Sequence, residues 1–136
     1  MCLHPTEEGL KKYDGKKGTF KFYKIFKLSD NDILKSPFHN HRITKPGRIC
    51  LPKKASLEIS YITGGIYEGC FHGYDCKKHA QREHYGIQLC FGCCVIIPIY
   101  VKGEDIIAAD HTNGTVCFFS YEIKKVDFDS VLKGDI

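Results

Sequence analysis

The chain has 136 residues and a net charge of +4 at pH 7, with 43% hydrophobic and 26% charged residues, as in an ordinary soluble globular protein. Its longest uncharged apolar run, residues 93–101, is too short to cross a bilayer, and its first residues lack the apolar core of a signal peptide. We therefore expect a cytoplasmic protein that does not enter a membrane, in the cytoplasm of the host cell if the source is viral. It would consist of a polar N-terminal arm over residues 1–18 and a single domain over residues 19–136.

Lysines and cysteines are both numerous, and the lysines form no obvious cluster. Lys-Lys doublets recur along the chain, in a scattered pattern that usually serves solubility; a weak phosphate-binding face is the alternative reading. Eight cysteines would indicate a disulfide framework in a secreted chain. Without an export signal we expect reduced thiols, most of them buried as small hydrophobic residues.

The first strong element is the stretch "TFKFYKIFKL" at residues 19–28, which alternates with the period of a β-strand. Its apolar face also carries Lys24, and a lysine that points at a core is costly unless another group pairs with it. Either Lys24 is paired inside the protein, or the strand lies at an edge where the side chain can reach solvent.

Residues 29–54 are rich in Ser, Asp, Asn, Pro and Gly and are predicted to be mainly loop. Strands are predicted over 56–63 and 66–71. The segment 74–85 is predicted to be a surface helix, with Asp75 as its N-cap and Gly86 at its end.

The apolar stretch at residues 93–101 predicts a central strand, and Pro98 within it suggests a bulge or a sheet edge. Two further strands flank Asn113-Gly114, a strong hairpin signal, and the tail is predicted to be a short helix or a docked extension. Strands follow one another without regular helices between them. The sequence therefore predicts an α+β domain with a mixed or mainly antiparallel sheet of five to seven strands and one or two short helices.

Cysteines and histidines gather between residues 70 and 94, which raises the hypothesis of a zinc site. The best tetrad combines a Cys-His pair three residues apart with a C-x2-C pair, namely Cys76, His79, Cys90 and Cys93. Separate thiols and surface histidines are the competing interpretation. A zinc ion with a catalytic water would also need a nearby general base such as Glu83.

The stretch "PFHNHR" ends at Arg42, whose planar guanidinium suits an anion, although an exposed polar loop explains the same residues. No P-loop or dinucleotide fingerprint is present in the sequence, and no Cys-His nucleophile pair stands out among its many candidates.

The order of "MCL", "FYKIFKL", "SPF", "GCFH", "KKHA", "VIIPIYV" and the hairpin "IIAADHTNGTVCFFSYEI" resembles small uncharacterised proteins of phages and gut bacteria. The layout is also similar to ADP-ribosyltransferase-type domains. That resemblance implies that Lys24 takes the place of the first dinucleotide-binding residue, and Phe71-His72 that of the corner before a helix. The late catalytic glutamate has no good counterpart, because neither Glu104 nor Glu122 fits its motif. The resemblance therefore implies a binding protein that retains a pocket.

The function expected from the sequence is non-catalytic binding by a small accessory protein of a phage or mobile element. Its partner would be a small ligand, such as a nucleotide or another phosphate-containing molecule, or a host protein. Alternatives are an ADP-ribosyltransferase-like enzyme that uses a nicotinamide dinucleotide, a zinc-stabilised nucleic-acid-binding protein, and a virion component. The expected pocket lies between strand 19–28 and the corner at 69–74, and its ligand-binding residues are Tyr23, Lys24, His72, Tyr74 and Arg42.

Overall fold

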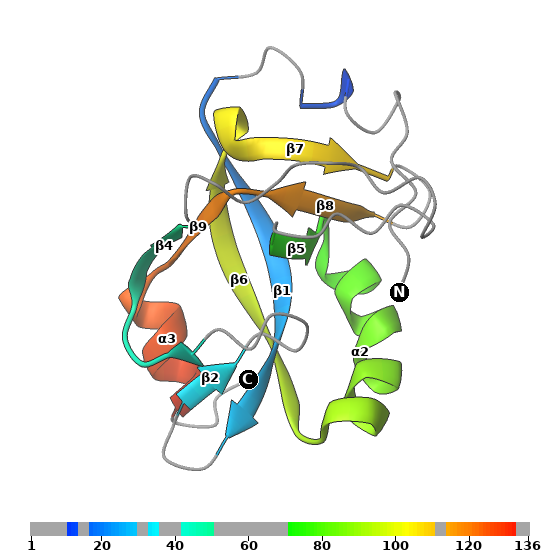
Figure 1. Cartoon of the computed structure of the whole chain (residues 1–136), viewed down its shortest axis with the longest axis vertical. Helices are drawn as coiled ribbons and strands as arrows, with labels where there is room; N and C mark the ends of the chain where they lie inside the picture. Colours follow the sequence, from blue (N-terminus) through cyan, green and yellow to red (C-terminus); the bar gives the residue numbers. More distant parts are fainter. Residues whose placement is uncertain are drawn as a thin grey trace.

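The fold is that of a computed structural model, which describes residues 11–13, 17–29, 33–35, 42–50, 71–110 and 114–132. These residues form nine strands, two α-helices and a short 3-10 turn (Figure 1). Every strand pair among the described residues is antiparallel. The predicted α+β class with a mainly antiparallel sheet is thus confirmed.

Two long strands form the centre of the sheet, β1 (Thr19–Ser29) and β6 (Cys94–Lys102). Their register is continuous from Thr19 opposite Lys102 to Lys27 opposite Cys94. Pro98 pairs with Tyr23 inside this register, so the predicted bulge is not found between these strands. On its other edge β6 pairs with β9 at Tyr100, two residues past Pro98, and Pro98 itself is not paired with a residue of β9.

The remaining strands extend this centre in both directions. The sheet order is β4-β9-β6-β1-β5-β8-β7, and β2 and β3 form a branch beside the far end of β1. Their bounds are β2 (Ile33–Lys35), β3 (Arg42–Ile43), β4 (Gly47–Cys50), β5 (Phe71–Tyr74), β7 (Ile106–Ala109), β8 (Thr115–Phe118) and β9 (Ser120–Ile123). The strand count exceeds the predicted five to seven because β2, β3 and β4 lie in the segment predicted as loop. The predicted strand 56–63 lies outside the described residues.

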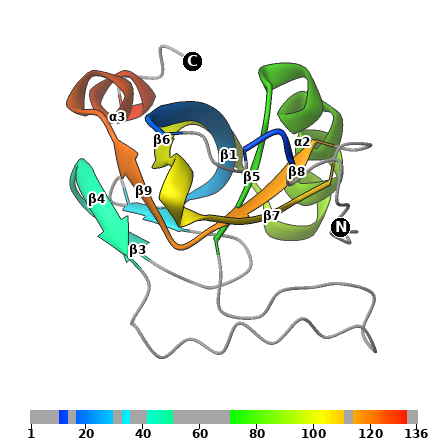
Figure 2. The ribbon, with the colours of Figure 1, turned by 90° about the horizontal axis from the view of Figure 1, so that it is seen from above.

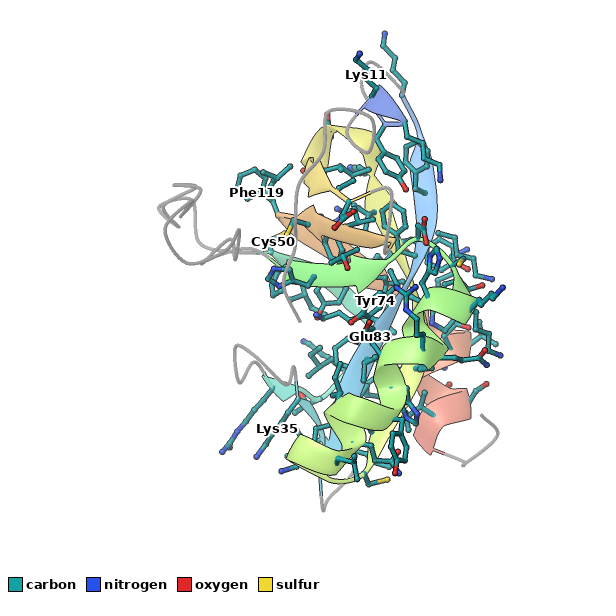
Figure 3. The ribbon with its side chains drawn as sticks, turned by 90° about the vertical axis from the view of Figure 1, so that its right-hand side faces the viewer. Lys11, Lys35, Cys50, Tyr74, Glu83 and Phe119 are labelled. Carbon is teal, nitrogen blue, oxygen red and sulfur yellow. The ribbon has the colours of Figure 1, made fainter. Side chains whose placement is uncertain are left out.

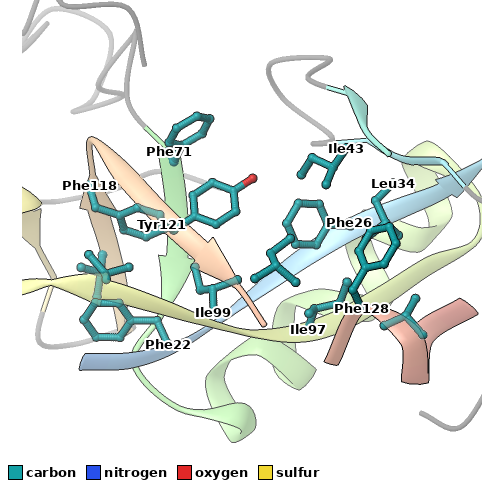
Figure 4. Packing of buried hydrophobic residues seen from close by; sticks show 14 of the residues in the cluster. Phe22, Phe26, Leu34, Ile43, Phe71, Ile97, Ile99, Phe118, Tyr121 and Phe128 are labelled. Atoms are coloured by element: carbon teal, nitrogen blue, oxygen red, sulfur yellow. The ribbon is translucent and has the colours of Figure 1, made fainter. Parts of the chain in front are cut away.

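The main core lies on the face of the sheet formed by alternate residues of β1, including Phe22 and Phe26. Tyr121 of β9 is fully buried, with its ring centre 4.9 Å from that of Phe71 and 5.8 Å from that of Phe118 (Figure 4). Although β8 and β9 are consecutive in the chain, three strands separate them in the sheet. Only Phe119 lies between β8 and β9 in the chain, so the sheet is strongly curled and these two strands follow each other end to end (Figure 2).

Helix α2 (Lys77–Phe91) covers the opposite face of the sheet (Figure 3). It packs there through a second apolar cluster of Ile25, Tyr74, Ala80, Ile87 and Cys94. The helix runs past Gly86, where the sequence predicted its end, because the next turn buries Ile87 against the sheet. Its N-cap residue is Cys76, and no side chain forms a cap hydrogen bond, so the predicted capping by Asp75 is wrong.

The C-terminal helix α3 (Lys125–Leu132) confirms the predicted helical tail and buries Phe128 and Val131 in the main core. The hairpin at Gly114 is also confirmed, because β7 and β8 pair on either side of it. A 3-10 turn, η2 (Gly103–Asp105), leads from β6 into β7. Among the described residues no helix is long and apolar enough to cross a membrane.

Candidate functional site

Three cationic side chains stand opposite one another on adjacent strands. Lys27 of β1 pairs with Lys35 of β2, and Lys35 in turn pairs with Arg42 of β3. Directly paired residues project from the same face of a sheet, and their Cα atoms lie about 5 Å apart. These three residues are called the cationic row, and it spans roughly 10 Å at the Cα positions.

The cationic row faces away from the main core. The neighbouring set of paired residues is Leu28, Leu34 and Ile43, and Leu34 and Ile43 are buried in that core. Because successive side chains of a strand point to opposite faces, the row belongs to the other face. Arg42 is exposed and the two lysines are half-buried, and Figure 3 shows Lys35 extending away from the ribbon. The charged ends of the row are thus within reach of a ligand.

The row carries positive charge that the described part of the chain leaves uncompensated. The ion pairs found there involve Lys12, Arg48, His79 and Arg82, and none involves a member of the row. Like charges directly opposite each other destabilise a sheet, so this arrangement costs stability unless an anion binds it.

The positive charge of Lys27 also acts on a buried thiol, that of Cys94. Cys94 lies opposite Lys27 on the other side of β1. Burial raises the pKa of the Cys94 thiol, and the neighbouring Cys93 adds to this rise, while the positive charge of Lys27 opposes it.

Lys24 is a further cation outside this row, and it points into the core as the alternation of β1 predicted. It is only 4% exposed, so it does not reach solvent. Its Nζ atom donates a hydrogen bond of 2.8 Å to the backbone carbonyl of His72 and lies 5.5 to 5.9 Å from the ring centres of Phe26, Phe71 and Tyr121. A cation enclosed in this way serves the fold, because a ligand would have to open the core to reach it.

The predicted ligand-binding residues do not form one group. Tyr23 and Tyr74 are paired across β1 and β5 and pack under α2, on the face opposite Lys24. Burial raises the pKa of Tyr74 well above its ordinary value, and the charge of Glu83 adds to this effect. Strand alternation places the His72 ring on the same face as Tyr74, so Lys24 meets the backbone of His72 and not its imidazole.

The predicted zinc tetrad is divided between the two ends of α2. Cys76 and His79 lie together at its start, where Asp75 joins them. Cys90 belongs to the last turn, and Cys93 follows the helix as an exposed thiol. A helix of this length separates its ends by roughly 20 Å, so the four residues cannot share one ion. The physical reason is that the segment after Gly86 continues as helix.

Two members of the cationic row, Lys27 and Lys35, were not among the predicted site residues. The alternation of residues 19–28 already placed Lys27 on the polar face of its strand. The partner of Lys27 could not be read from the sequence, because β2 and β3 are too short to show a period of their own.

Comparison of the chain with models of protein families, with curated proteins and with solved structures gives no match.

Proposed function

We propose that the protein binds a phosphate-bearing ligand through the cationic row, without catalysis. The observation that supports this proposal is the direct pairing of Lys27 with Lys35 and of Lys35 with Arg42 on the face turned away from the main core. Three adjacent cations lower the free energy of an anion placed over them more than scattered charges can.

The short length of the row favours an anion that carries several negative charges close together. A phosphate group carries between one and two negative charges near neutral pH, whereas a carboxylate carries one. Two linked phosphates can therefore neutralise a row of roughly 10 Å, while a peptide needs three carboxylates brought equally close. Arg42 at one end adds a planar fork that can bind two phosphate oxygens at once.

A binding titration with tripolyphosphate tests the proposal. The neutral variant Lys35→Gln removes the middle charge, and we expect it to weaken binding about tenfold or more, as loss of a charge-assisted hydrogen bond does. The matched control is Lys102→Gln, an exposed lysine at the opposite end of the paired β-strands, which should bind like the wild type. Equal affinity of the wild type and Lys35→Gln would refute the proposal.

Two further ligands in the same titration distinguish between the classes of anionic partner. A single-stranded oligonucleotide that binds more tightly than tripolyphosphate, and loses this affinity in Lys35→Gln, would indicate a nucleic acid as the partner. Poly-glutamate that binds more tightly than both would instead indicate an acidic protein and overturn the choice of phosphate. Raising the salt concentration should weaken each of these interactions, because they depend on exposed charges.

A further inference from the structure

Asp75, Cys76 and His79 bring three kinds of metal-binding group together where β5 passes into α2. One ligand atom from each residue lies within 4.8 Å of the other two, and all three residues are half-buried. The local chain explains this: Asp75 and Cys76 form the bend after β5, and His79 lies in the first turn of α2. Residues three and four positions apart share one side of a helical turn, which brings His79 back to Cys76 and Asp75.

A second segment holds the bend in place from outside. The backbone N–H of Asp75 donates a hydrogen bond of 2.8 Å to the carbonyl of Gly114, which follows the turn between β7 and β8. Gly114 has a φ of +75°, and a Cβ atom there would collide with the side chains of His79 and Asp75. Only glycine leaves room for these two side chains at this point, so the ligand atoms are confined between the helix and the hairpin.

We propose that Asp75, Cys76 and His79 bind a divalent metal ion of the zinc class. Thiolate and imidazole groups favour zinc over magnesium or calcium, and carboxylate oxygen is an accepted third ligand. Three protein ligands leave the fourth tetrahedral position to a water molecule. This site shares no residue with the cationic row, so it goes beyond the proposed phosphate binding and can fail or succeed independently of it.

Binding requires two small adjustments. Asp75 Oδ1 and His79 Nδ1 are joined by a hydrogen bond of 2.5 Å, and this bond must open because ligands of one zinc ion lie roughly 3.5 Å apart. Lys12 lies 3.8 Å from the other Asp75 oxygen, but its side chain is 60% exposed and can turn into solvent. The ion then balances the negative charge of Asp75, which Lys12 faces in its absence.

Cobalt titration of the purified, reduced protein tests the site. Co²⁺ occupies zinc sites and reports its ligands by absorption, so we expect one equivalent to give tetrahedral d–d bands and a thiolate-to-cobalt charge-transfer band. Zn²⁺ should abolish both. In Cys76→Ser the charge-transfer band should vanish, and in His79→Gln the affinity should fall at least about tenfold.

Cys93→Ser is the matched control, because Cys93 is an exposed thiol at the other end of the same helix. It should keep both the spectrum and the affinity of the wild type. The proposal is overturned if no tetrahedral spectrum appears, or if Cys93→Ser loses the band while Cys76→Ser keeps it. Circular dichroism of each variant without metal establishes that it folds, and His79→Gln decides the question should Cys76→Ser fail to do so.

Discussion

At the scale of single residues, substitutions of Lys24 test whether its side chain is buried and hydrogen-bonded in the core. Its truncation in Lys24→Ala removes a long side chain from the core and leaves the His72 carbonyl without this donor. We expect a loss of about 3 kcal/mol in the free energy of unfolding, from the cavity and the lost hydrogen bond together. Lys24→Met keeps the volume, so its loss should be about 1 kcal/mol. Urea unfolding measures both, and a Lys24→Ala variant as stable as the wild type would mean that the side chain is solvated.

Substitution of Tyr121 by Phe is expected to raise the stability of the protein, in contrast to the Lys24 variants. Its hydroxyl group is buried and has no hydrogen-bond partner among the described residues. A buried polar group without a partner destabilises the fold, so Tyr121→Phe should raise the free energy of unfolding by about 1 kcal/mol while keeping the ring contacts with Phe71 and Phe118. Thermal and urea unfolding both report this change. A clear loss of stability would show that the hydroxyl is in fact bonded.

At the scale of elements, two glycines, one within α2 and one packed against its first turn, should respond in opposite ways to alanine. Gly86 lies within α2, is exposed, and has nothing within 4 Å of an added Cβ atom. Gly86→Ala should therefore stabilise the protein by up to about 1 kcal/mol, because alanine favours the helix. Gly114→Ala should destabilise it by more than about 1 kcal/mol, since its φ is positive and the Cβ atom collides with α2. Unfolding midpoints that shift in the same direction would contradict the described contact between hairpin and helix.

The elements that the sequence predicted are those with a strong local signal. Alternation over residues 19–28 marked β1 and placed Lys24 on its inner face, and Asn113-Gly114 marked the hairpin. The cationic row had no such signal, because it depends on how β1, β2 and β3 align in space. The end of α2 was also misplaced: burial of Ile87 outweighs the weak helix preference of Gly86. Local patterns determine elements, whereas register and burial depend on the whole fold.

At the scale of the whole molecule, buried tyrosines predict a sensitivity to alkali. Burial raises the pKa of Tyr13 to about 12, with the charges of Asp75 and Cys76 adding to the rise, and burial also raises the pKa of Tyr74 and Tyr121. Below pH 10 these phenols are protonated in both the folded and the unfolded chain, so they leave stability unchanged. Between about pH 10 and 12 the unfolded chain loses its protons first, and stability must fall.

Urea midpoints measured across this alkaline range check the expectation. Lysines also titrate there, so the informative quantity is the difference between the wild type and Tyr121→Phe, which lacks one buried phenol. The wild type should lose more stability than Tyr121→Phe as the pH rises. Parallel curves for the two proteins would show that Tyr121 ionises as easily in the folded state as in the unfolded one.

The cationic row is the feature on which the proposed function depends, and residue-resolved NMR tests it most directly. Tripolyphosphate added to isotope-labelled protein should shift the backbone amide signals of Lys27, Lys35 and Arg42 in a saturable manner. The amide of Lys102, at the other end of the paired strands, should not move. Saturable shifts centred on Lys102, or no shifts at the three paired cations, would contradict the account.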